Sequence, residues 1–292
     1  MKSKLAIGTA QFGLNYGITN QNGQVELAEV KNILKYAKKN QIITIDTAIA
    51  YGTSELSIGN SNINGLKIFT KLPNILKSSD DIDFSINRLV DQSMTNLKVS
   101  QLEGIFFHNP LQLLSKEGKQ IWDSVRKIKK EGKIKKIGIS VYNPGEIERL
   151  WNIFSFDAIQ APFNILDRRI KTSGWLKKMN ESDVEVHVRS VFLQGLLLMN
   201  PIERNILFSK WKSTWIFMDS WLNKNNLSPI EAALGFVLSE KLINYIVIGV
   251  ESKDQLKQIV EIAKRKFNQD DFPESLSIED LDLIEPVNWR QK

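Results

Sequence analysis

The chain of 292 residues contains no cysteine and only two histidines, His108 and His187. A disulfide, a thiolate nucleophile, a cysteine-based metal site and a histidine-rich metal site are therefore all excluded. No apolar stretch approaches the roughly 20 residues that a membrane-spanning helix needs, and the amino terminus shows no signal peptide. We therefore expect a cytoplasmic protein with no membrane partner.

The formal net charge is +6, and the densest group of basic residues spans 126–136. Ile128 and Ile134 interrupt this group, and no aromatic side chains alternate with the basic ones to stack on bases. We interpret the group as a solvated face and expect no nucleic-acid partner.

Eight short apolar segments alternate with longer segments in which apolar residues recur at helical spacing. The expected strands are 5–9, 43–45, 68–70, 104–107, 137–139, 158–159, 184–188 and 245–248. This alternation predicts an α/β protein with a closed (β/α)8 architecture, a TIM barrel, that forms a single domain over residues 1–292.

Polar residues or a glycine stand where most of these strands end. They are Asp46, Lys71, His108, Ser140, Gln160, Arg189 and Gly249. Barrel enzymes place their sites at the carboxyl ends of the strands, so we expect these residues to share one site. Tyr51 follows Asp46 by five residues, which lets the loop turn its phenol back toward the carboxylate.

Asp46, Tyr51, Lys71 and His108 form a chemically coherent set. A tyrosine holds its proton at neutral pH, and a neighbouring Lys71 ammonium would lower the pKa of Tyr51 toward the working range. The Asp46 carboxylate would keep Lys71 charged, and His108 would orient a carbonyl oxygen. The set therefore predicts catalysis, with Tyr51 as the general acid that protonates an aldehyde or ketone while a hydride reduces it to an alcohol.

This set resembles the aldo-keto reductase superfamily. The family signature is an Asp-Thr-Ala-x-x-Tyr segment, matched by residues 46–51, then a lysine closing the next strand and a histidine closing the one after. The resemblance covers nearly the whole chain. It implies an oxidoreductase with a small-molecule carbonyl substrate and a nicotinamide cofactor, NADPH or NADH, extended across the barrel mouth. No G-x-G-x-x-G follows a strand, so a Rossmann site is not indicated.

Three segments resemble family positions near the nicotinamide. Ser140 and Gln160 match the residues that hold the carboxamide, although Val141 stands where the family has asparagine, and Thr9 matches the first-loop position. The segment that begins at Arg189 resembles the one whose aromatic ring stacks on nicotinamide. It contributes Arg189, Ser190 and Phe192 as candidate cofactor contacts. A planar guanidinium can also stack, and the alternative is that Arg189 pairs with a carboxylate or a substrate anion.

The segment after the eighth strand resembles the one that holds the adenosine phosphates at a helix amino terminus. Its candidate cofactor contacts are Gly249, Glu251, Ser252, Lys253 and Gln255. Glu251 stands where many members carry arginine or lysine for the 2′-phosphate of NADPH. A carboxylate repels a phosphate and accepts hydrogen bonds from a ribose hydroxyl, which favours NADH, whereas Lys253 nearby would compensate.

The substrate side is less defined. Phe12, Tyr16, Tyr142 and Phe163 are candidates for an aromatic pocket. The segment 206–226 is expected to pack in the core rather than form a lid, and the tail 286–290 is a candidate cover for the barrel mouth. The motifs resemble a bacterial branch found with sugar and surface-polysaccharide genes, which points to a sugar-derived carbonyl.

A second function stays open, because some members of this fold are non-catalytic regulatory subunits that bind a nicotinamide cofactor. The sequence leaves the substrate, the direction of the reaction and the oligomeric state open.

Overall fold

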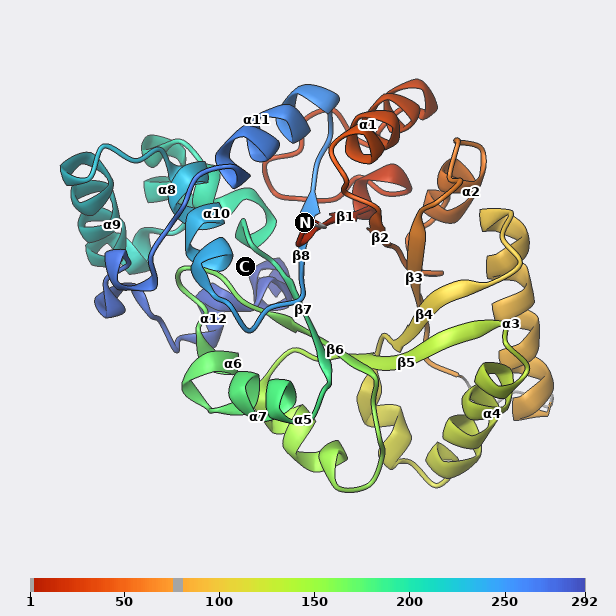
Figure 1. Ribbon diagram of the computed structural model, residues 1–292. Helices are drawn as coiled ribbons and strands as arrows, with labels where there is room; N and C mark the ends of the chain where they lie inside the picture. Colours follow the sequence, from red (N-terminus) through yellow and green to blue (C-terminus); the bar gives the residue numbers. More distant parts are fainter. Residues whose placement is uncertain (1–2, 76–80, 292) are drawn as a thin grey trace.

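The computed structural model describes residues 3–75 and 81–291. Eight parallel strands pair in sequence order and close into a barrel, which confirms the expected TIM barrel (Figure 1). The strands are β1 (Leu5–Gly8), β2 (Thr44–Asp46), β3 (Lys67–Leu72), β4 (Leu102–Phe107), β5 (Ile134–Ser140), β6 (Ala158–Pro162), β7 (Glu185–Arg189) and β8 (Tyr245–Gly249).

Helices surround the barrel and cover the outer faces of its strands (Figure 1). They are α1 (Leu27–Lys39), α2 (Ser54–Gly59), α3 (Ile82–Leu97), α4 (Gly118–Lys130), α5 (Pro144–Trp151), α6 (Arg169–Thr172), α7 (Trp175–Glu181), α8 (Pro201–Leu207), α9 (Lys212–Lys224), α10 (Pro229–Ser239), α11 (Lys253–Ala263) and α12 (Leu281–Ile284). In α4, Ile121, Val125 and Ile128 form one buried stripe that faces the barrel. α10 begins with a capping box between Ser228 and Glu231, which fixes the start of that helix.

Two strands continue past the site residue that was expected to end them. β3 continues one residue beyond Lys71, and β6 continues two residues beyond Gln160, so neither side chain comes from the last residue of its strand. Backbone pairing explains the extension of β6, because Ala161 and Pro162 lie in register with Val188 and Arg189 of β7. The alternation of side chains along a strand is unchanged by this extension, so Gln160 remains on the interior face.

Large rings fill the lower part of the barrel interior. Phe69 and Phe106 pack against each other with ring centroids 5.5 Å apart, and His187 contacts both rings. Glycines on neighbouring strands make room for them, since a Cβ on Gly104 or Gly138 would lie only 2.6 Å from a ring carbon of Phe69 or Phe106. This layer closes the barrel from below and keeps the groups above it away from water.

The segment 206–226 packs in the core, as expected from the sequence. Trp215, Met218 and Leu222 on α9 are buried, and the indole nitrogen of Trp215 donates to the carbonyl of Phe208. Arg204 of α8 is also buried, and it is paired with Asp219 at 2.6 Å. These contacts join α8, α9 and the segment between them to one another.

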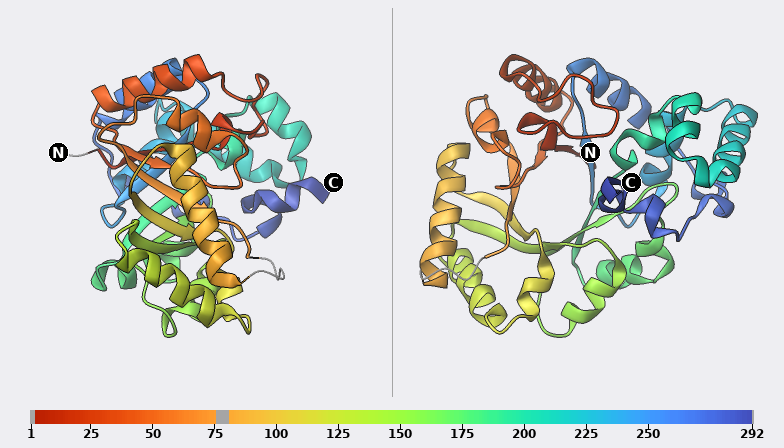
Figure 2. Two further views of the ribbon diagram at one scale, coloured as in Figure 1. Left: turned by 90° about the vertical axis from the view of Figure 1, so that its right-hand side faces the viewer. Right: turned by 180° about the vertical axis from the view of Figure 1, so that it is seen from behind.

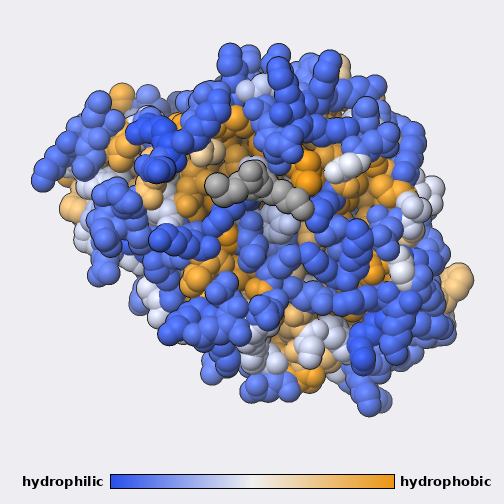
Figure 3. All heavy atoms as spheres, in the orientation of Figure 1, coloured by the Kyte–Doolittle hydropathy of each residue, from blue (hydrophilic) through white to orange (hydrophobic). Residues whose placement is uncertain are grey.

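The basic residues of 126–136 are largely neutralised by neighbouring carboxylates. Lys129 pairs with Asp157 and Lys133 with Asp91, each at 2.7 Å, and Lys136 pairs with Glu185 at 2.6 Å. The region over α4, at the lower right of the face in Figure 3, is hydrophilic. Both observations agree with a solvated face. Within 3–75 and 81–291, no helix is both long and apolar enough to cross a membrane.

The carboxy-terminal segment reaches the opposite end of the barrel from the ring layer. α12 and the short helix η7 (Pro286–Gln291) lie beside the barrel opening in the right-hand view of Figure 2. Arg169, at the start of α6, donates to Glu285 at 2.8 Å and so ties this segment to the barrel.

Candidate active site

A cavity of about 530 Å³ opens at the carboxyl ends of the strands. Its volume lies in the range of small-molecule sites. Of the eleven residues predicted to contact the cofactor, nine line this cavity. They are Thr9, Ser140, Gln160, Arg189, Ser190, Phe192, Gly249, Glu251 and Gln255. Asp46, Tyr51 and His108 line it too. The described residues contain no cluster of histidine and carboxylate side chains that could hold a metal ion.

The four residues predicted to be catalytic meet at one end of this cavity. Asp46 is the last residue of β2, Lys71 lies near the end of β3, His108 directly follows β4, and Tyr51 lies in the turn before α2. The ring centroids of Tyr51 and His108 are 5.9 Å apart in an edge-to-face arrangement. The Lys71 Nζ lies 5.2 Å from the centre of the Tyr51 ring.

Lys71 and Asp46 form a buried ion pair beneath the phenol. Lys71 Nζ lies 2.6 Å from Asp46 Oδ2, and the two side chains are only 1% and 6% exposed. Lys71 also donates to the carbonyl oxygen of Thr47 at 3.0 Å, so its position is fixed by two acceptors. The lysine does not line the cavity itself, and it acts on the cavity through its charge.

Burial controls the protonation of this group. It raises the pKa of Tyr51, and the Asp46 carboxylate raises it further, whereas the Arg189 charge opposes the rise. This direction is opposite to the lowering expected from the sequence, because the desolvation of the phenolate outweighs nearby positive charge. Burial lowers the pKa of His108 to about 4, helped by the charges of Lys71 and Arg189. At neutral pH the phenol is therefore protonated and the imidazole is neutral.

A hydrogen-bonded chain joins Asp46 to the two residues expected to hold a carboxamide. Gln160 Nε2 donates to Asp46 Oδ1 at 2.7 Å, and Ser140 Oγ donates to Gln160 Oε1 at 3.2 Å. Asn164, four residues after Gln160, has a structural role, because its side chain bonds to the backbone of Ser190, Leu166 and Asp167.

Thr9 is fully buried, although it contributes to the cavity wall. Its hydroxyl donates to the backbone carbonyl of Asp46 at 3.0 Å and accepts from Ser54 at 2.9 Å. Thr9 therefore fixes the end of β2, from which Asp46 projects.

Arg189 lies on the cavity wall between β5 and β7. Its Nη2 donates to the carbonyl of Val141 at 3.0 Å, its Nη1 donates to Ser190 Oγ at 3.1 Å, and its guanidinium lies 4.9 Å from the centre of the Tyr142 ring. Of the alternatives left by the sequence, pairing with a carboxylate is not observed within 4.0 Å among the described residues. The following loop is strained, since Ser190 and Gln194 adopt left-handed backbone angles with φ of 59° and 53°.

The segment after β8 forms the other end of the cavity. Ser252 caps α11 by accepting from the backbone N–H of Gln255, and the Lys253 backbone N–H donates to Glu29 at 2.6 Å. Ser252 and Lys253 do not line the cavity, unlike Glu251 and Gln255. Burial raises the pKa of Glu251, and a hydrogen bond from Asn22 acts against that rise.

Loops, short 3-10 helices and α11 contribute wall residues that the sequence did not single out, among them Gln11, Thr19, Gln194, Leu198 and Gln258. Gln11 lies close against Gly249, where a Cβ would be 2.7 Å from its Nε2. Of the four aromatic candidates, Tyr16 and Tyr142 line the cavity, whereas Phe12 and Phe163 are fully buried in the core. Pro286 and Val287 of the tail line the cavity as well.

These residues fit an extended nicotinamide cofactor. The cavity runs from the amino-terminal turn of α11, where Glu251 and Gln255 line it, to the Tyr51 phenol. Gly249 has no side chain at this end, and the Gln11 side chain lies against it on the cavity wall. Ser140 and Gln160 supply amide and hydroxyl groups at the other end.

The model of the aldo/keto reductase family matches residues 4–280 of the sequence. The chain belongs to the aldo/keto reductase family. Membership of the aldo/keto reductase family indicates the class of reaction at this site, which is the oxidation of alcohols and the reduction of carbonyl groups with a nicotinamide cofactor.

Individual relatives of this aldo/keto reductase are distant. The oxidoreductase YqkF of Bacillus subtilis is 22% identical over 190 residues, which cover 62% of this chain and 61% of that protein. The aldo-keto reductase AKR11C1 from Bacillus halodurans, in its holo form, has a TM-score of 0.74 at 18% identity, covering 96% of this chain and 95% of that one. The glycerol dehydrogenase AKR11B4 from Gluconobacter oxydans has a TM-score of 0.70 at 20% identity, covering 98% and 93%. These structures share the fold of this chain.

Proposed function

We propose that this protein is an NAD(P)H-dependent oxidoreductase that reduces an aldehyde or a ketone to an alcohol, with Tyr51 as the general acid. The observation that supports the proposal is the placement of the Tyr51 phenol beside a neutral His108 at the end of the cavity, above the buried Lys71–Asp46 pair. The elevated pKa of Tyr51 keeps the phenolic proton available at neutral pH.

The cofactor, when bound, supplies a hydride to the carbonyl carbon. The phenol of Tyr51 then donates its proton to the carbonyl oxygen, which takes up the electron pair of the C=O π bond. His108, which is neutral, donates an N–H to the same oxygen and orients it. The phenolate that remains on Tyr51 is stabilised by the ammonium of Lys71, and it regains a proton from solvent. Asp46 positions that ammonium.

The proposed cofactor contacts follow the cavity wall. Ser140 and Gln160 hold the carboxamide, and the turn of Gly249, Ser252 and Gln255 holds the phosphates. Glu251 favours NADH, because its carboxylate repels a 2′-phosphate and accepts from a ribose hydroxyl. The remaining proposed cofactor contacts are Lys253, Thr9, Ser190 and Phe192.

A sugar-derived carbonyl suits the side chains on the substrate side. Tyr16 and Tyr142 offer aromatic faces, and Thr19 and Gln194 offer hydrogen-bonding groups. A cytoplasmic location, where NADPH and NADH are available, fits this activity. A non-catalytic regulatory role is the weaker alternative. Asp46, Tyr51 and His108 line one cavity and Lys71 is paired with Asp46, which supports the catalytic role.

The test is the substitution Tyr51→Phe. We expect turnover of a neutral aldehyde to be abolished while fluorescence titration still shows saturable cofactor binding, because the change removes only the phenolic oxygen. Tyr36→Phe, on α1 and away from the cavity, is the matched control and should leave activity unchanged. Near-normal activity of Tyr51→Phe would contradict the assignment of the general acid. Binding of neither NADPH nor NADH by the wild type would contradict the cofactor site.

A further inference from the structure

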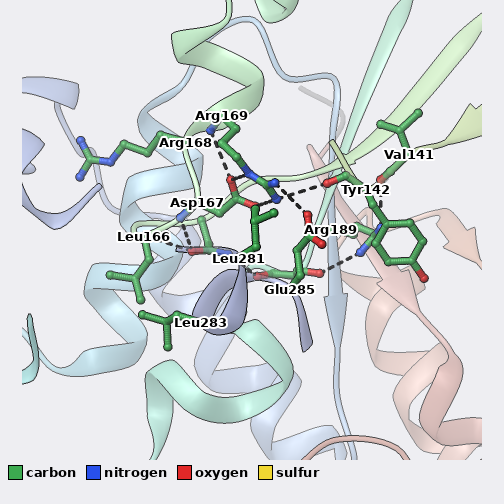
Figure 4. Close-up of polar contacts among 12 residues, drawn as sticks. Val141, Tyr142, Leu166, Asp167, Arg168, Arg169, Arg189, Leu281, Leu283 and Glu285 are labelled. Atoms are coloured by element: carbon green, nitrogen blue, oxygen red, sulfur yellow. Dashed lines mark hydrogen bonds and ion pairs between the residues drawn. The ribbon is translucent and has the colours of Figure 1, made fainter. Parts of the chain in front are cut away.

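Arg189 and the neighbouring Arg169 differ in the groups that they contact. Arg169 lies nearby and is held by two carboxylates, Asp167 at 2.9 Å and Glu285 at 2.8 Å (Figure 4). Arg189 has no carboxylate within 4.0 Å among the described residues, and its guanidinium contacts a carbonyl, a hydroxyl and the ring of Tyr142 (Figure 4).

The carboxylates closest in the fold are already engaged. Glu285 is occupied by Arg169, and Glu146 accepts a hydrogen bond from the backbone N–H of Tyr142 at 3.0 Å. The carboxylate of Asp46 is shared between Lys71 and Gln160. No carboxylate of the described residues therefore forms an ion pair with Arg189, although the charge of Arg189 acts on Glu146 and opposes the rise in its pKa that burial causes.

This charge belongs to the catalytic end of the cavity. Among the described residues that line the cavity, Arg189 is the only lysine or arginine. Its charge contributes to lowering the pKa of both His108 and Lys71, so it acts on the groups that would surround a substrate carbonyl. An anionic group bound at this end would be stabilised by a guanidinium in surroundings of low dielectric constant.

The N–H groups of Arg189 that make no hydrogen bond in the structure also favour an anionic ligand. A guanidinium carries five N–H donors, and the two hydrogen bonds to Val141 and Ser190 leave three of them unused. Tyr142 covers the guanidinium at 4.9 Å. A neutral ring stacked on Arg189 would give the remaining donors no acceptor, whereas a carboxylate accepts two of them at once.

We propose that Arg189 binds a carboxylate on the substrate, so that the protein reduces aldehydes or ketones that also carry a carboxylate group. This proposal rests on the proposed function, since it names the substrate class of the same site. One guanidinium matches one negative charge, which favours a carboxylate over a doubly charged phosphate. The carbonyl of the substrate lies at Tyr51 and His108, and its carboxylate lies at Arg189 against Tyr142.

The experiment compares substrates that differ only in the anionic group. Initial rates are measured for 4-oxobutanoate against butanal, for 4-carboxybenzaldehyde against benzaldehyde, and for glyceraldehyde 3-phosphate against glyceraldehyde. The proteins are the wild type, Arg189→Gln, Arg189→Lys and the control Arg149→Gln, which removes an exposed arginine on α5 outside the cavity. The dissociation constants of NADPH and NADH are measured for each protein by fluorescence.

We expect the wild type to prefer the carboxylate-bearing member of a pair. Arg189→Gln should raise the KM for that member by about 10- to 100-fold, the usual worth of a charge-assisted hydrogen bond, and leave the neutral member and cofactor binding nearly unchanged. Arg189→Lys should recover part of the loss, and Arg149→Gln should behave as the wild type.

Three results would overturn the proposal. Arg189→Gln could affect both members of each pair equally, it could weaken cofactor binding without changing selectivity, as a stacking role requires, or the wild type could prefer the phosphate. Each of these results keeps the neutral aldehydes as substrates, so the proposed function would survive. If the wild type bound neither NADPH nor NADH and reduced none of these substrates, the proposed function itself would be contradicted.

Discussion

The substitution Asp46→Asn tests the buried pair that supports the proposed acid. Lys71 Nζ lies 2.6 Å from Asp46 Oδ2, and both side chains are less than a tenth exposed. Removing one charge of such a pair leaves the other buried without a counter-ion, which costs about 3–5 kcal/mol. An asparagine also cannot accept from both Lys71 and Gln160, because one of its terminal atoms is a donor. We therefore expect the free energy of unfolding to fall by about this amount.

The assay is urea denaturation of the wild type, Asp46→Asn, Lys71→Met and the double variant. Because the double variant buries no unpaired charge, it should be more stable than either single variant, and the cycle should give a favourable coupling energy. All three variants should lose most of their turnover. An Asp46→Asn protein within about 1 kcal/mol of the wild type, or a double variant whose loss equals the sum of the single losses, would refute the reasoning.

Two further predictions concern pH and the cofactor. Because the pKa of His108 is about 4 in the folded chain and 6.5 when unperturbed, the unfolded chain binds more protons between these values. Stability to urea should thus fall as the pH is lowered from 6.5 to 4. The variant His108→Gln should show a smaller fall, and the part that remains is expected from buried His187. An unchanged dependence of stability on pH in this variant would contradict the lowered pKa of His108. Glu251→Gln should tighten NADPH binding several-fold relative to NADH in a fluorescence titration, and an unchanged ratio would show that Glu251 does not read the 2′-position.

The sequence was enough to predict the barrel and its four-residue group. Eight apolar segments alternate with helical ones, and parallel strands in a barrel end at the same face, so Asp46, Lys71 and His108 had to lie near one another. Loop conformations do not follow from such periodicity. Phe12 and Phe163 are fully buried in the core, whereas Tyr16 reaches the cavity, and nothing in their spacing separates these outcomes.

The pKa of Tyr51 shows a second limit of the same kind. The sequence identifies the charges that surround a phenol, but the depth of burial depends on packing among segments that are distant in the chain. The layer of Phe69, Phe106 and His187 closes the barrel below the site, and loop residues line the cavity above it. Desolvation then exceeds the effect of positive charge, and the direction of the shift is reversed.

Val141 and Arg189, the two departures from the family pattern around the nicotinamide, are parts of one local arrangement. Val141 is fully buried and offers no side-chain hydrogen bond, yet its backbone carbonyl accepts from Arg189 at 3.0 Å. The guanidinium thereby lies against the backbone of Val141, the position where the resemblance expects an asparagine. Because Arg189 is partly buried and forms no ion pair among the described residues, a cavity with Arg189 in its wall gains most from a substrate that brings a negative charge with it.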